Sequence, residues 1–78
     1  MKHELWMDEE GLGTFCLTGE RGNDARALLE PGSKLVWSCE AHSHFDAMTK
    51  YYQYMDWGIY TTDYPEQDKK TYKEMGWE

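Results

Sequence analysis

The side chains that could act as nucleophiles, bases or metal ligands lie in one short stretch of the chain. They are Cys39, His42, Ser43, His44 and Asp46. A thiolate, two imidazoles and a carboxylate can together bind a transition metal, and a thiol or hydroxyl beside an imidazole can act as a nucleophile. The spacing C-x2-H-x-H-x-D matches no closed zinc pattern. We therefore treat this stretch as an alternative site for a small ligand or a metal.

The predicted structure around this stretch argues against metal binding and catalysis. The stretch joins the end of a strand to the start of a helix, where exposed amide groups attract anions and repel cations. Neighbouring side chains on such a turn rarely face one another, and 78 residues leave little room for a substrate pocket. We expect no enzymatic activity, no cofactor and no bound metal, and we expect Ser43 to cap the helix.

The helix that would position these residues is the best-defined element of the sequence, over residues 43–58. Ser43 and Asp46 resemble a capping box, with Asp in the usual place of Glu. Gly58 stands where a left-handed residue would end the helix. Bulky apolar side chains recur at helical spacing and predict the inward face. They are Phe45, Met48, Tyr52 and Met55, with Tyr51 alongside.

Three segments alternate apolar and polar residues and predict strands, at 3–8, 14–18 and 34–40. A loop rich in Gly and acids joins the first two, which indicates an antiparallel hairpin. A short helical segment at 25–30 precedes the third strand, and residues 59–62 favour a fourth strand or an extended segment. The predicted fold is α+β, in the order ββ(α)βα. A small antiparallel sheet of three strands, or of four if residues 59–62 join it, packs in two layers on one main helix. Strand orders 2-1-3 and 1-2-3 both fit the loop lengths.

The apolar signal decays towards the C-terminus, since after Pro65 only Tyr72 and Met75 offer an apolar face. We therefore expect one globular domain over residues 1–64 and a weakly ordered tail over residues 65–78. Residues 74–77 faintly echo residues 54–57, but a single echo does not predict a repeat.

The charge of the chain restricts its partners. Fifteen acidic residues against eight basic ones give a net charge of −7, which disfavours binding to nucleic acid or to an anionic membrane. No apolar run approaches the ~18 residues of a membrane span, and the first residues do not form a secretion signal. We expect a cytoplasmic protein in which Cys16 and Cys39 stay reduced.

Aromatic residues are abundant, with four Trp, six Tyr and two Phe. Those in and after the main helix are too many for one helix face to bury, and Tyr and Trp are enriched at binding hot spots. The predicted interaction surface consists of Tyr51, Tyr54, Trp57, Tyr60 and Tyr64. It would bind a protein partner or a second copy of the chain, unless the C-terminal segment folds back and covers it. We expect at least one of Tyr51, Tyr54 and Trp57 to be more than half exposed.

Residues 28–64 carry the patterns EPG-x-x-LVW, SHF-x-AMT-x-YY-x-YM-x-W-G-x-YTT. Taken together, these patterns resemble a group of small uncharacterised bacterial proteins of unknown function. The resemblance implies a bacterial, cytoplasmic origin, and it implies no activity, cofactor or catalytic residue.

Overall fold

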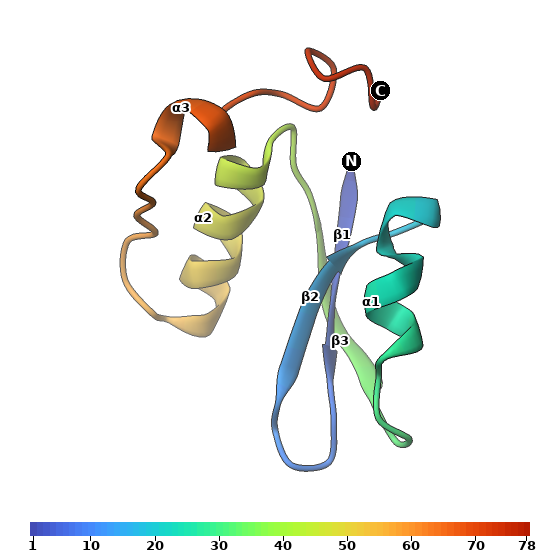
Figure 1. Cartoon of the computed structure of the whole chain (residues 1–78). Coiled ribbons are helices and arrows are strands. Elements are labelled where there is room, and N and C mark those ends of the chain that lie inside the picture. The colour runs from blue at the N-terminus through green and yellow to red at the C-terminus, as the bar shows by residue number, and fades with distance from the viewer. The chain divides into compact units, whose positions relative to one another are not determined.

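The computed structural model describes all of residues 1–78, and the chain divides into two compact units. One unit is Lys2–Cys39, and the other is Glu40–Glu78 together with Met1. Figure 1 shows the elements along the chain: three strands, with a short helix between the second and the third, and two further helices after the third strand. The predicted α+β class, with an antiparallel three-stranded sheet, is confirmed.

The strands of the sheet are β1 (Lys2–Met7), β2 (Gly13–Leu17) and β3 (Lys34–Glu40). β1 and β2 form the predicted antiparallel hairpin. Asp8 closes its loop, because one carboxylate oxygen accepts hydrogen bonds from the backbone N–H groups of Glu10 and Leu12, each at 2.9 Å. These side-chain bonds add to the backbone bond from the Asp8 N–H to the Leu12 carbonyl, at 3.0 Å.

The strand order is β2-β1-β3, one of the two orders that the loop lengths allow. Between β2 and β3 the chain forms a 3-10 turn, η1 (Glu20–Gly22), and a short helix, α1 (Asn23–Ala27). The helix begins and ends earlier than the predicted segment 25–30. No fourth strand forms over residues 59–62, which have no regular secondary structure. The fourth strand is therefore corrected to an irregular segment.

Arg26 of α1 fixes this connection against the end of β2. Its guanidinium donates to the carbonyl oxygens of Leu17, at 2.9 Å, and Gly19, at 2.6 Å, and to the side chain of Asn23. Gly22 approaches the same carbonyl so closely that an added Cβ would lie 1.6 Å from the Leu17 oxygen. Only glycine fits this contact between the 3-10 turn and the strand.

The main helix of the second unit is α2 (His44–Met55), and it begins where the sequence predicts. The Ser43 hydroxyl accepts a hydrogen bond from the backbone N–H of Asp46 at 3.0 Å. The Asp46 carboxylate accepts in turn from the backbone N–H of His42, at 3.3 Å. The second half of the capping box is thus displaced by one residue, to the position before the cap.

The end of α2 differs from the prediction. Asp56, not Gly58, takes the first left-handed conformation, with φ of 57°. The N–H of Trp57 bonds to the carbonyl of Tyr52 at 3.0 Å, and the N–H of Asp56 bonds to that of Gln53 at 3.3 Å. These are the two bonds of a Schellman motif. The helix stops two residues early because the Trp57 ring then packs on the Tyr52 ring, at 5.4 Å between centroids.

The buried side of α2 is also displaced from the predicted stripe. Ala47 and Tyr51 are the buried residues of the helix. The predicted inward residues are only half-buried. They are Phe45, Met48, Tyr52 and Met55. Phe45 and Tyr52 instead contact Tyr60, in the chain that doubles back along α2 to the short helix α3 (Pro65–Asp68), as Figure 1 shows.

Residues 71–77 form a closed turn, which begins with a capping box and ends with the same motif that stops α2. Thr71 and Glu74 make a full capping box, with bonds of 3.1 and 3.3 Å between side chain and backbone. The N–H of Trp77 bonds to the carbonyl of Tyr72 at 2.8 Å, and Gly76 has φ of 78°. This is the same stop as Tyr52 to Trp57, so the faint sequence echo corresponds to a repeated structure.

The closed turn is attached to the start of α2. The backbone N–H of Tyr72 donates to the carbonyl of His42 at 2.8 Å, Ser43 and Thr71 form an isolated bridge, and Tyr72 is only 2% exposed. The sequence predicts that residues 65–78 are weakly ordered, which concerns the stability of these contacts. This stays a prediction, and so does the domain boundary at residue 64.

Candidate functional site

Aromatic rings around α2 form a continuous chain of edge-to-face contacts. Phe45 contacts Tyr60 at 5.4 Å, and Tyr60 contacts Tyr52 at 5.2 Å. Tyr52 contacts Trp57, which also contacts Tyr51 at 5.2 Å. Such pairs contribute about 0.5–1.5 kcal/mol each beyond the area that they bury. The cluster therefore holds the chain that follows α2 against the helix.

Two contacts hold α3, one to the chain that follows α2 and one to α2 itself. The Tyr60 hydroxyl donates to the Asp68 carboxylate at 2.8 Å. Burial and this hydrogen bond raise the pKa of Tyr60, and the same bond lowers the pKa of Asp68. The Lys69 ammonium lies over the Phe45 ring, 4.8 Å from its centroid. α3 is thus held both to Tyr60 and to the first turn of α2.

The predicted interaction surface divides into exposed and supporting residues. Trp57 is 53% exposed, Tyr54 46% and Tyr64 74%. Tyr51 is buried and Tyr60 half-buried, so these two support the surface and do not form it. Trp57 meets the expectation that at least one of Tyr51, Tyr54 and Trp57 is more than half exposed.

Sequence reasoning missed Ile59, which is 89% exposed and lies between Trp57 and Tyr64 in the sequence. From the sequence, Ile59 is interpreted as the first residue of a fourth strand or extended segment over residues 59–62. Without a partner strand, the Ile59 side chain stays in solvent. We define the aromatic surface by its four exposed members, Tyr54, Trp57, Ile59 and Tyr64.

The C-terminal segment does not cover the exposed end of α2. Tyr72 bonds to His42, before the first turn of the helix, whereas Trp57 follows the last turn. Trp57 remains more than half exposed with all 78 residues present. Of the two alternatives weighed for these aromatic residues, the open surface is the one observed at Trp57.

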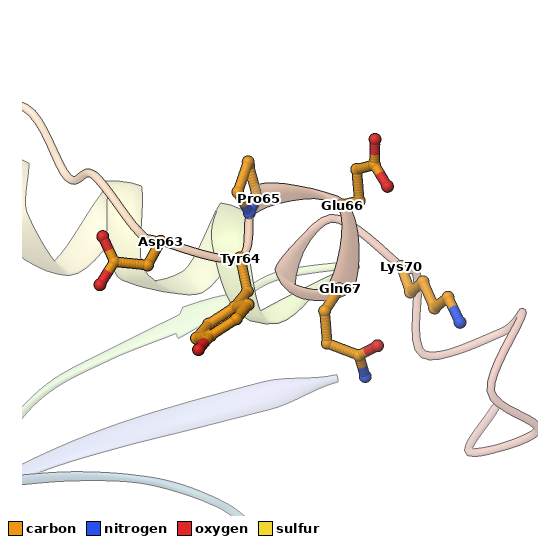
Figure 2. A pocket seen from close by; sticks show the side chains of 6 residues that line it. All are labelled: Asp63, Tyr64, Pro65, Glu66, Gln67 and Lys70. Carbon is orange, nitrogen blue, oxygen red and sulfur yellow. The ribbon is translucent and has the colours of Figure 1, made fainter.

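A cavity of about 440 Å³ adjoins Tyr64 at α3. Its lining comprises Asp63, Tyr64, Pro65, Glu66, Gln67 and Lys70. Figure 2 shows that Tyr64 and Gln67 point to one side of the chain, while Pro65 and Glu66 point to the other. Because the polar groups diverge, the cavity lacks the converging donors that fix a small ligand. It extends the surface beside Tyr64.

At the alternative ligand site, the charged groups neutralise one another. Asp46 lies 3.1 Å from the His42 imidazole and 3.2 Å from the Lys50 ammonium. Burial alone would raise the pKa of Asp46, but the hydrogen bonds from Lys50 and from the His42 backbone lower it. A cavity of about 340 Å³ opens here, and its lining also includes Met1, paired with Glu78 at 2.5 Å.

The other residues of the alternative site have structural partners. Ser43 is buried and caps α2, and the exposed His44 places its ring edge on Tyr60 at 6.4 Å. Cys39 is a half-buried cysteine of β3 outside any disulfide, and it belongs to the other compact unit. No group of three or more His, Cys, Asp or Glu side chains is arranged to hold a metal ion. The structure brings His42, Ser43 and Asp46 together as a helix cap.

Comparison of the chain with protein families, with curated proteins and with solved structures found no match. None of the helices has the length and apolar composition needed to cross a lipid bilayer. A proposal about function therefore depends on the residues and their geometry alone.

Proposed function

We propose that this chain is a small non-enzymatic protein that acts by contact, binding a protein partner or a second copy of itself through the aromatic surface. The observation that supports the proposal most is the state of Trp57. Its ring is more than half exposed, yet Tyr51 and Tyr52 hold it by two edge-on contacts. A large side chain that is both exposed and fixed is suited to serve as an anchor.

A fixed anchor binds well for a physical reason. A rotamer-rich side chain that becomes ordered on binding costs about 0.5–1.5 kcal/mol, and a ring already ordered by its neighbours avoids most of this loss. Trp and Tyr are also the residues most enriched at binding hot spots. Ile59 and Tyr64 supply further exposed apolar area in the segment that follows Trp57.

The charges suggest the chemistry of a partner. Asp56, Asp63 and Glu66 lie among the members of the aromatic surface in sequence and are exposed, within a chain of net charge −7. A protein with an apolar patch bordered by basic residues would complement this surface, whereas nucleic acid and anionic membranes would be repelled. We place the protein in the bacterial cytoplasm, where its two thiols stay reduced.

The test compares one exchange at two exposed sites. Ile59→Asp places a charge in the aromatic surface, and Leu28→Asp does so outside it, at a residue that is 83% exposed. We expect both variants to melt like the wild type. Only Ile59→Asp should lose the partner captured from a native bacterial lysate, or the self-association seen by native mass spectrometry. If Ile59→Asp and Trp57→Ala both bind as the wild type does, the proposal is wrong.

A further inference from the structure

β3 has an exposed edge that no other strand pairs with. It lies at the end of the order β2-β1-β3. Along its length only Trp37 and Cys39 are half-buried, and the other positions are exposed, including Leu35 at 47% and Val36 at 45%. An apolar, unpaired edge strand is a template for pairing with another strand.

The opposite edge of the sheet is partly occupied. The carbonyl oxygen of Leu17 in β2 accepts a hydrogen bond from Arg26, and the backbone at Gly22 lies against it. β2 is therefore blunted at its C-terminal end. On β3 the occupied outward carbonyl is that of the last residue, Glu40, which accepts from Lys50, so the middle of β3 is the stretch of sheet edge that is open to a partner.

The residues that follow β3 show which of its backbone groups point outward. Ala41 exchanges backbone hydrogen bonds with Met1, which directly precedes β1, at 3.0 and 2.5 Å. Because strand backbone groups alternate, odd-numbered residues of β3 face β1 and even-numbered residues face outward. The carbonyl of Glu40 agrees with this assignment, since it accepts from the Lys50 side chain at 2.6 Å. Val36 and Ser38 thus carry the outward N–H and C=O groups at the middle of the strand.

We propose that β3 pairs antiparallel with β3 of a second copy of this chain, about a two-fold axis at Trp37. In this register Val36 lies opposite Ser38 of the second copy, and their outward groups exchange hydrogen bonds. Lys34 lies opposite Glu40, once on each side of the axis, so two ion pairs form. A shift by one pair in either direction loses both ion pairs. Charge complementarity therefore selects the occupant and its register.

The same register extends an apolar row across the two copies. Leu35 lies opposite Cys39 on one face, and the two Trp37 residues meet at the axis. Trp37 already stacks on Phe15 of β2, with centroids 6.0 Å apart. Pairing would thus join two sheets into one, at a site separate in sequence from the aromatic surface.

A disulfide tests the register directly. Residues facing one another in a non-hydrogen-bonded antiparallel pair have Cα atoms about 4.5 Å apart, within the range that a disulfide spans. Leu35→Cys should therefore crosslink to Cys39 of the second copy under copper-phenanthroline oxidation. Wild type, Val36→Cys and Leu35→Cys/Cys39→Ser should stay uncrosslinked. The absence of a Leu35→Cys dimer, or equal crosslinking of Val36→Cys, would overturn the register.

Blocking the edge tests the pairing itself. Val36→Pro removes an outward N–H, which an edge strand tolerates, so the variant should melt like the wild type but sediment as a monomer. Lys34→Glu should weaken association about tenfold, and Lys34→Glu/Glu40→Lys should restore it. Lys34→Glu is the cleaner single change, because Glu40 also lies 3.9 Å from the Met1 ammonium.

Two outcomes would contradict the pairing. One is a wild type that sediments as a monomer at its highest soluble concentration. The other is a Val36→Pro variant that associates as the wild type does. Ile59→Asp should leave the Leu35→Cys crosslink unchanged, so failure of the aromatic surface and failure of β3 pairing are distinguishable.

Discussion

Asp56 is the residue of this chain whose backbone conformation is least favourable for its type. It has φ of 57°, a region that costs most residues about 1–2 kcal/mol and that glycine adopts readily. Its carboxylate also lies at the C-terminal end of α2, where the helix dipole disfavours negative charge. Both features of Asp56 therefore lower the stability of the folded protein.

Asp56→Gly should accordingly raise the free energy of unfolding by about 1 kcal/mol, measured by urea titration. The matched control, Gln53→Gly, adds the same residue to the interior of α2 and should lower that free energy by about 1 kcal/mol. If both glycines destabilise, the left-handed stop does not lie at Asp56.

The pKa of Asp46 makes stability dependent on pH. Because its folded-state pKa is lowered, its contribution is fully present above the unfolded value of about 3.9 and is lost as pH falls through the lowered value. Asp46→Asn should lower the melting temperature at neutral pH and flatten the acid side of the stability curve below about pH 4. Asp63→Asn, at an exposed residue, is the control and should leave the curve unchanged. Equal curves for wild type and Asp46→Asn would refute the assignment.

Tyr51 separates support from surface. It is only 8% exposed, and its ring contacts the Trp57 ring, with 5.2 Å between the centroids. Tyr51→Ala should lower the free energy of unfolding by about 3–5 kcal/mol, whereas Ile59→Ala should change it little. Denaturant titration of the two variants would show it. Similar losses for both would mean that the surface and its support cannot be distinguished.

At the scale of elements, features set by neighbours in the sequence were predictable. Alternation located the strands, and Ser43 with Asp46 located the start of α2. The stop at Asp56 was not predictable from local preference, because it depends on the Trp57 ring packing on Tyr52. The strand order depends on the connection that Arg26 braces against β2. Contacts of this kind are invisible in a local pattern.

The candidate site was predictable to a similar extent. Composition indicated an excess of aromatic residues, and Tyr54, Trp57 and Tyr64 are exposed. Which aromatic residues lie beneath was not predictable, since α2 buries the side that carries Ala47 and Tyr51. The chain after the helix decides this, by covering Phe45 and Tyr52 with Tyr60.

The closed turn at residues 71–77 makes a prediction about the C-terminal segment. Tyr72 is almost fully buried and its N–H bonds to His42. Tyr72→Ala should therefore cost about 3–5 kcal/mol, comparable with other large aromatic truncations, in thermal or denaturant melts. Hydrogen exchange of the Tyr72 amide in the wild type gives a second measurement. A neutral substitution together with fast exchange would favour the weakly held tail that the sequence suggests.

At the scale of the whole molecule, the dominant property is its net charge of −7. Fifteen acidic residues are present with only eight basic ones, so negative side chains repel one another in the folded protein. Raising the ionic strength from low salt to about 0.15 M shortens the screening length to about 8 Å and should raise the melting temperature. Scanning calorimetry at constant pH would measure it. A melting temperature that falls with added salt would mean that attractive ion pairs outweigh the repulsion.

The repeated stop also gives this protein internal reporters. Trp57 and Trp77 occupy the same position in two turns of the same design, but their tyrosine neighbours differ in orientation. The Trp57 ring is nearly perpendicular to Tyr52, at 88°, whereas the Trp77 ring is nearly parallel to Tyr72, at 11°. Since Trp6 and Trp37 lie in β1 and β3, fluorotryptophan labelling would give one ¹⁹F resonance for each of four elements. Ring-current shifts should set the Trp57 and Trp77 lines apart, so partner binding, strand pairing and fraying of the last turn could each be followed in one spectrum.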